Sequence, residues 1–189
     1  MKKIGITLFV IGMATVQMLA QTNYKIAKGS EVEVKGTSTL HDWEMKSSTI
    51  TGQAIFSMDD KGLTDVKDLQ LSIVSESLKS EKDGMDKNAY KALKTSSNKN
   101  ITFQSSRLVS LEHKGSGYAV VCEGKLQIAG VTKITTVNAT CTPDGAAIKC
   151  TGEKVFKMTE YQVEPPSFMF GTVNTGEEVT IKFNVVFNK

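Results

Sequence analysis

The residues most able to do chemistry stand together at His41–Asp42–Trp43. An aspartate can orient an imidazole for acid–base work, and an indole can cover an opening or stack on a ligand. The alternative is a hairpin loop in which His41 or Asp42 hydrogen-bonds the backbone while Trp43 plugs one end of the fold. We favour the loop, because a single histidine without a second reactive group is weak evidence for catalysis.

Other reactive patterns are missing from the sequence. The second of the two histidines, His113, stands in a charged segment before Gly115 that is typical of a solvated turn. No set of histidine, cysteine and carboxylate residues has the spacing of a metal site. The chain also lacks a GxSxG motif, a phosphate-binding glycine loop and a dinucleotide fingerprint. We therefore expect no catalytic residue, no metal and no cofactor.

The cysteines offer a structural bond instead of a reactive one. Cys141 and Cys150 flank a short connection, and a turn centred on Gly145–Ala146 would place them opposite each other. A cross-strand disulfide is then geometrically possible, although a slip of one residue in the register would prevent it. Both outcomes stay open. Cys122 lies on an apolar row and is expected to be a buried apolar residue.

The first twenty residues have the pattern of a cleaved secretory signal peptide. The basic residues Lys2 and Lys3 precede an uncharged apolar run that ends in Ala20 before the polar Gln21. The run is short for a membrane anchor, and no basic stop-transfer cluster follows it. The sequence thus predicts a signal peptide at 1–20 and one domain at 21–189, soluble and periplasmic or secreted, without stable membrane insertion.

Composition narrows the class of protein further. Of the 189 residues, 40% are apolar, which is ordinary for a globular domain and excludes global disorder. The formal net charge is +3, and removing Lys2 and Lys3 with the signal peptide leaves +1. A nearly neutral chain gives no electrostatic reason to expect nucleic-acid binding.

Alternation of apolar and polar residues with a period of two predicts strands through most of the chain. Eight are expected, at about 30–38, 46–58, 67–77, 101–112, 117–129, 132–142, 147–158 and 178–187. One short helix is expected within Asp83–Ser97, between the third and fourth strands. A long irregular connection is expected at Thr159–Thr175, because Pro165–Pro166 excludes a helix interior and a central strand.

Eight antiparallel strands can close into a barrel, which removes both sheet edges. The fold class is therefore predicted as all-β, an eight-stranded antiparallel barrel with one helix. Several inward positions are small: Gly36, Gly52, Ala54, Gly124 and Ala139. Small residues can leave room for a ligand, or they can relieve crowding where a strand bends. The alternation alone does not choose between these interpretations.

Gly124–Lys133 (GKLQIAGVTK) joins a strand, a glycine turn and the next strand. Three earlier stretches precede it in the chain: Leu78–Ser80, Asn88–Leu93 and Asn100–Ser105. In order and spacing these stretches resemble the YceI-like family of exported bacterial lipid-binding proteins, with Gly124–Lys133 the most specific and the other three similar to the family's central segment. The similarity spans roughly residues 23–187. It implies a lipocalin-like barrel whose long apolar cavity holds a polyisoprenoid or another long-chain amphiphile, with no catalytic residues to carry over.

We accordingly expect an exported binder or carrier of such a lipid, and we assign its cavity to inward apolar residues. The candidates are Val34, Ile50, Ala54, Phe56, Leu71, Ile73, Phe103, Tyr118, Val120, Leu126, Phe168, Phe170 and Phe183, with His41 and Trp43 at the cavity mouth. Taken singly, an inward apolar residue is more often plain core, so the lipid assignment rests on the resemblance. The alternatives are an enzyme that uses His41 and Asp42, and a filled barrel without a ligand. The oligomeric state stays open, with a homodimer among the options.

The mature protein should begin near Gln21. Intact mass spectrometry of the protein recovered from the periplasm or medium measures this. A species that keeps Met1 and stays in the membrane fraction would contradict the prediction.

Overall fold

The alternating segments form strands that join into one antiparallel sheet. The computed structural model describes residues 20–168 and 171–189. The strands are β1 (Ala20–Ile26), β2 (Glu31–Ser38), β3 (Trp43–Ser47), β4 (Ile50–Asp59), β5 (Gly62–Val74), β6 (Asn100–Lys114), β7 (Gly117–Ile128), β8 (Val131–Asp144), β9 (Ala147–Lys157), β10 (Ser167–Phe168) and β11 (Val173–Asn188). The helices are η1 (Ser75–Ser77), α1 (Asp83–Ala92) and η2 (Met158–Tyr161). Apart from Ala20, where β1 begins, the expected signal peptide lies outside the described residues.

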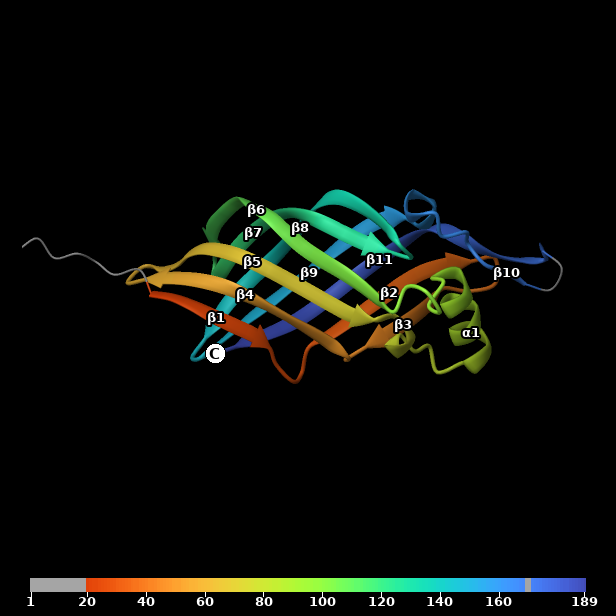
Figure 1. The fold of residues 1–189 in the computed structure, drawn as a ribbon, viewed down its shortest axis with the longest axis horizontal. Coiled ribbons are helices and arrows are strands. Elements are labelled where there is room, and N and C mark those ends of the chain that lie inside the picture. The colour runs from red at the N-terminus through yellow and green to blue at the C-terminus, as the bar shows by residue number, and fades with distance from the viewer. Residues whose placement is uncertain (1–19, 169–170) are drawn as a thin grey trace, which may run out of the picture.

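The sheet closes on itself. Its strand order runs β1-β4-β5-β6-β7-β8-β9-β11, and β11 also pairs with β1, so eight strands form a ring. The closing pairs are Lys25 with Asn188 and Ile26 with Phe187. β2, which forms a hairpin with β3, pairs with the part of β11 that precedes the residues paired with β1. The ring is elongated, and α1 lies at the same end as β3 and β10 (Figure 1).

The described residues form a sheet of eleven strands, where the alternation predicted eight. The chain is interrupted between strands at places that the alternation does not indicate. β1, which the sequence reading missed, pairs with β11 just beyond the residues that β2 pairs with. Between β1 and β2, the buried Ser30 hydroxyl donates to the Ala27 carbonyl at 2.9 Å and accepts from the Val186 N–H at 2.9 Å. The single strand expected at 46–58 divides into β3 and β4. The connection expected to be irregular contains η2 and β10.

The side chains on neighbouring strands show whether the glycines leave open space or relieve crowding. A Cβ atom added at Gly36 would collide with the Trp43 ring, and one at Gly152 would collide with the Phe183 ring. A Cβ at Gly124 would lie 2.8 Å from the Phe103 ring, which is too close for a real side chain. These glycines therefore relieve crowding under large neighbours and do not leave open space.

Aromatic side chains close the end of the ring away from α1. Phe56 and Phe187 have almost no exposed surface, and their rings meet edge to face with centroids 5.2 Å apart. Tyr24 makes the same kind of contact with Phe56, also at 5.2 Å. Edge-to-face aromatic pairs add to the free energy gained by burial. Within the described residues, no helix is long and apolar enough to cross a bilayer.

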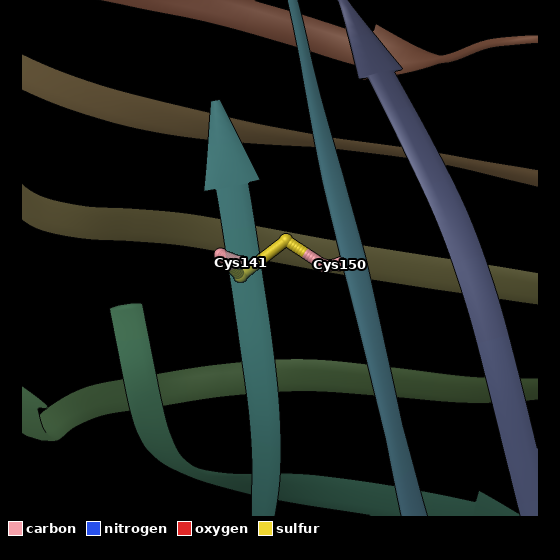
Figure 2. Close-up of a disulfide and its surroundings, with 2 residues drawn as sticks. All are labelled: Cys141 and Cys150. Carbon is pink, nitrogen blue, oxygen red and sulfur yellow. A yellow bond between two sulfur atoms is a disulfide. The ribbon is translucent and has the colours of Figure 1, made fainter. Parts of the chain in front are cut away.

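A disulfide joins β8 to β9 near this packed end (Figure 2). The tight turn pairs Asp144 with Ala147 and so sets Cys141 opposite Cys150, in the register that a turn at Gly145–Ala146 predicts. Both cysteines are buried. Cys122 is also buried and has a free thiol; burial, with a smaller effect from the charge of Asp65, raises its pKa to about 11.

Replacing Cys141 and Cys150 by alanine should lower the free energy of unfolding by about 2–3 kcal/mol, because the bond restricts a short loop of the unfolded chain. Denaturant unfolding followed by circular dichroism measures this. A reductant should destabilise the wild type and the Cys122→Ala variant alike, and should leave the double variant unchanged. Wild-type unfolding that does not respond to reductant would contradict the prediction.

Candidate functional site

A cavity of about 390 Å³ occupies the end of the ring that carries α1. Three parts of the chain enclose it: the β2–β3 hairpin, the helix α1, and the segment from η2 to β10. Inward residues of β11 and β6, among them Val179 and Ile101, form its floor. The lining is mostly aliphatic and aromatic, with a few polar side chains such as Ser38 and Asn88. We call this space the outer cavity.

The helix α1 supplies one wall. Met85, Ala89, Ala92 and Leu93 line the outer cavity, and their spacing places them on one face of the helix. The buried Asp86 holds the start of α1, since it accepts hydrogen bonds from the Ser80 N–H at 2.8 Å and the Ser80 hydroxyl at 2.7 Å. Burial alone would raise the pKa of Asp86, but these bonds and a nearby lysine outweigh it and lower the pKa.

The β2–β3 hairpin supplies the second wall and carries the residues first considered for chemistry. The Ser38 hydroxyl accepts from the backbone N–H groups of Leu40 and His41, each at 3.3 Å, which fixes the turn. The Trp43 indole lies over Gly36 and donates to the Thr37 carbonyl at 3.0 Å. His41 and Trp43, which the sequence assigned to the cavity mouth, both line the outer cavity.

The contacts of His41 do not form an acid–base pair. Its ring Nδ1 lies 2.8 Å from the main-chain carbonyl of Asp42, and that bond involves no carboxylate. His41 and Asp42 are both exposed. In the described residues, no group of three or more histidine, cysteine, aspartate or glutamate side chains could hold a metal ion. This geometry fits the loop interpretation of His41–Asp42–Trp43 better than a catalytic one.

The third wall is the connection between β9 and β11. Met158, Tyr161 and Val163 are buried and line the outer cavity together with Phe168 of β10. The Tyr161 ring packs edge to face on Phe156, with centroids 5.2 Å apart. Phe170, which the sequence also proposed, lies outside the described residues.

A second cavity of about 110 Å³ lies deeper in the ring, and we call it the inner cavity. Ile101 and Ile181 line both cavities, so the two spaces adjoin at these side chains. Ile73 and Phe183 point inward but keep part of their surface accessible, as expected where side chains surround a hollow. Ala139 also lines the inner cavity, so among the small inward residues it does leave room.

Ten of the thirteen proposed lining residues border one of the two cavities. The inner cavity takes Ile50, Phe56, Leu71, Ile73, Phe103, Val120, Leu126 and Phe183. The outer cavity takes Val34 and Phe168.

Ala54 and Tyr118 were also assigned to the cavity lining, but neither borders the outer or the inner cavity. Ala54 has no exposed surface and packs in the closed end of the ring, where it pairs with Tyr24. The Tyr118 hydroxyl donates to the Lys61 carbonyl at 3.1 Å, and its ring fills the space beside Gly62. Alternation identifies inward residues, but it does not tell a hollow part of the interior from a filled one.

The sequence reading missed the lining residues of α1 and η2, and it missed Lys154. The helical spacing of Met85, Ala89 and Ala92 was a usable signal for the first group. Lys154 stands on the inward row of β9 beside Phe156 and lines the inner cavity. The alternation along β9 places Lys154 on the inward row, but a lysine is not expected among apolar lining residues, so it was not proposed.

Solved structures with low sequence identity share this fold. BcnA from Burkholderia cenocepacia has a TM-score of 0.67 at 22% identity, over 83% of this chain and 95% of that one. A polyisoprenoid binding domain from Saccharophagus degradans, implicated in plant cell wall breakdown, has a TM-score of 0.64 at 11% identity, over 89% and 99%. The YceI protein of Campylobacter jejuni has a TM-score of 0.55 at 14% identity, over 100% and 99%.

No curated protein matches the chain in sequence. A family model does match it, and the match covers nearly all of the described ring. The YceI-like domain model extends over residues 21–187, and the chain therefore belongs to the YceI-like family.

Proposed function

We propose that this protein binds the hydrocarbon of a polyisoprenoid or another long-chain amphiphile in its outer and inner cavities. The observation that carries the proposal is the pair of neighbouring apolar cavities, which share the lining residues Ile101 and Ile181. Family membership and the fold shared with a polyisoprenoid binding domain support the same ligand class. The protein acts as a binder or carrier in this proposal and performs no reaction.

Burial of the tail supplies the binding free energy. Each five-carbon isoprene unit removed from water contributes roughly 3–4 kcal/mol before the costs of association are subtracted, at about 0.8 kcal/mol per methylene-sized group. The half-buried side chains that border the cavities, such as Val34 and Phe183, would lose their remaining contact with water when a tail lies against them. Ligand and protein thus gain from the same burial.

We further propose that the protein is exported to the periplasm or secreted, so that the binding domain begins near residue 21. The basic start and apolar run of residues 1–20 support this. The disulfide between Cys141 and Cys150 supports it independently, because such bonds persist in oxidising compartments. A carrier there would shield a long apolar tail from water.

The substitution Ala89→Trp should reduce lipid binding strongly, because Ala89 lines the outer cavity and an indole would fill the space that the tail needs. The amount of lipid that copurifies with the protein, measured by mass spectrometry after organic extraction, gives the result. Ala146→Trp, in the exposed turn between β8 and β9, is the matched control and should retain its lipid. Overpacking can cost about 1–3 kcal/mol, so thermal unfolding of both variants must be compared.

His41→Ala separates the binder from the enzyme. Within the described residues, the hydrogen bonds of His41 stay in its own turn and its side chain is exposed, so this variant should keep most of its lipid. A folded Ala89→Trp variant with normal lipid content would contradict the binding proposal. Loss of a measurable turnover in His41→Ala would favour the enzyme alternative.

A further inference from the structure

The hydrogen-bonded ladder between β8 and β9 is shorter than the strands themselves. Pairing joins Asn138–Asp144 to Ala147–Glu153, close to the turn that carries the disulfide. Toward the helix end, residues 131–137 of β8 pair with β7, and residues 154–157 of β9 pair with β11. In the described part of the chain, no backbone pair joins these two stretches to each other. We call this interval the β8–β9 seam.

Charged and polar side chains stand on the inward face beside the seam. Residues directly opposite each other in an antiparallel pair share a face of the sheet. Lys154 lies opposite Ile181, which borders both cavities, and Lys133 lies opposite the buried Leu126. Both lysines therefore belong to inward rows, where an apolar residue is the rule.

Lys154 is the more enclosed of the two lysines. It is half-buried and borders the inner cavity, whereas Lys133 is exposed. Its neighbour across the strand pair, Ile181, lines both cavities. Among the described residues, no ion pair or side-chain hydrogen bond involves Lys154 or Lys133, whereas other lysines such as Lys35 and Lys157 do have carboxylate partners.

An ammonium group beside an apolar cavity needs either water or a counter-charge. Burying a charge without a partner is costly, and a lysine can avoid the cost by extending its methylene chain along apolar surface toward solvent. An anion in the cavity would give Lys154 the partner that the protein does not supply. Charge-assisted hydrogen bonds of this kind are stronger than neutral ones.

We propose that Lys154 binds the oxyanion of an acidic amphiphile in the inner cavity, beside Ile181, which lines both cavities. This inference rests on the proposed function, since the ligand's hydrocarbon must occupy the apolar cavities. The ligand enters with its acidic group first, and its tail fills the larger outer cavity behind it. A carboxylate and a phosphate monoester share the required chemistry, and a neutral alcohol of the same chain length lacks it.

Three probes with one saturated chain test this directly: tetradecanoic acid, tetradecyl phosphate and tetradecanol. The fluorescence of Trp43, the only tryptophan and a lining residue of the outer cavity, reports binding to delipidated protein. At neutral pH, the wild type should bind at least one acidic probe about tenfold more tightly than the alcohol, the size expected for one charge-assisted bond. Which acid binds better identifies the oxyanion.

Lys154→Met keeps the length and apolar stem of the side chain and removes its charge. It should bind the alcohol as the wild type does and lose the preference for the acidic probe. Lys133→Met, at the exposed lysine that borders neither cavity, should keep most of that preference. Lys149→Met, on the exposed outward row of the same strand, is the matched control and should keep all of it.

The possible results separate the two proposals. Equal affinity of the wild type for all three probes, or a preference that survives in Lys154→Met, overturns the inference about Lys154 and leaves the lipid-binding proposal intact. A folded wild type that binds none of the probes overturns both. Circular dichroism of each variant confirms that it is folded before the affinities are compared.

Discussion

Closure of the sheet by β11 is the constraint on which the rest of the structure depends. This one strand pairs with β9 along one edge, and with β1 and then β2 along the other. Among the described residues, two pairs, at Lys25 and Ile26, join β1 to the C-terminal end of β11. When the sheet closes, one row of side chains on each strand faces inward. The volume of these side chains then decides whether the interior is filled or hollow.

The two ends of the ring make opposite use of that interior. At the end away from α1, the rings of Tyr24, Phe56 and Phe187 interlock, and Phe56 and Phe187 close the inner cavity on that side. At the other end, the outer cavity lies between α1, the segment after β9 and the inward residues of the strands, such as Ile101. Protein interiors are normally close-packed, so a hollow bordered by apolar side chains costs stability unless a ligand fills it. This difference between the ends places the larger of the two cavities in the half of the ring that carries α1, which is where we propose that the ligand binds.

The sequence predicts the local features well and the non-local ones poorly. The inward row of β7, from Tyr118 to Ile128, follows from alternation, and the position of Cys141 opposite Cys150 follows from the chemistry of the turn. The interruption between β1 and β2 at Ser30 involves a hydrogen bond with Val186, which is far along the chain. No local sequence pattern predicts it. Ala54 belongs to the closed end for the same reason, since its neighbours come from distant strands. Lys154 gains its significance only from where the β8–β9 ladder stops.

The central claim is that the two adjoining cavities hold a long apolar chain. Native mass spectrometry of the protein isolated gently from its source cells tests it most directly, because the mass difference between bound and denatured protein gives the ligand and its stoichiometry. The account predicts one long-chain hydrocarbon amphiphile per protein, released on denaturation into organic solvent. A native mass equal to that of the bare polypeptide, in protein that also takes up no long-chain lipid when it is offered, would contradict the account.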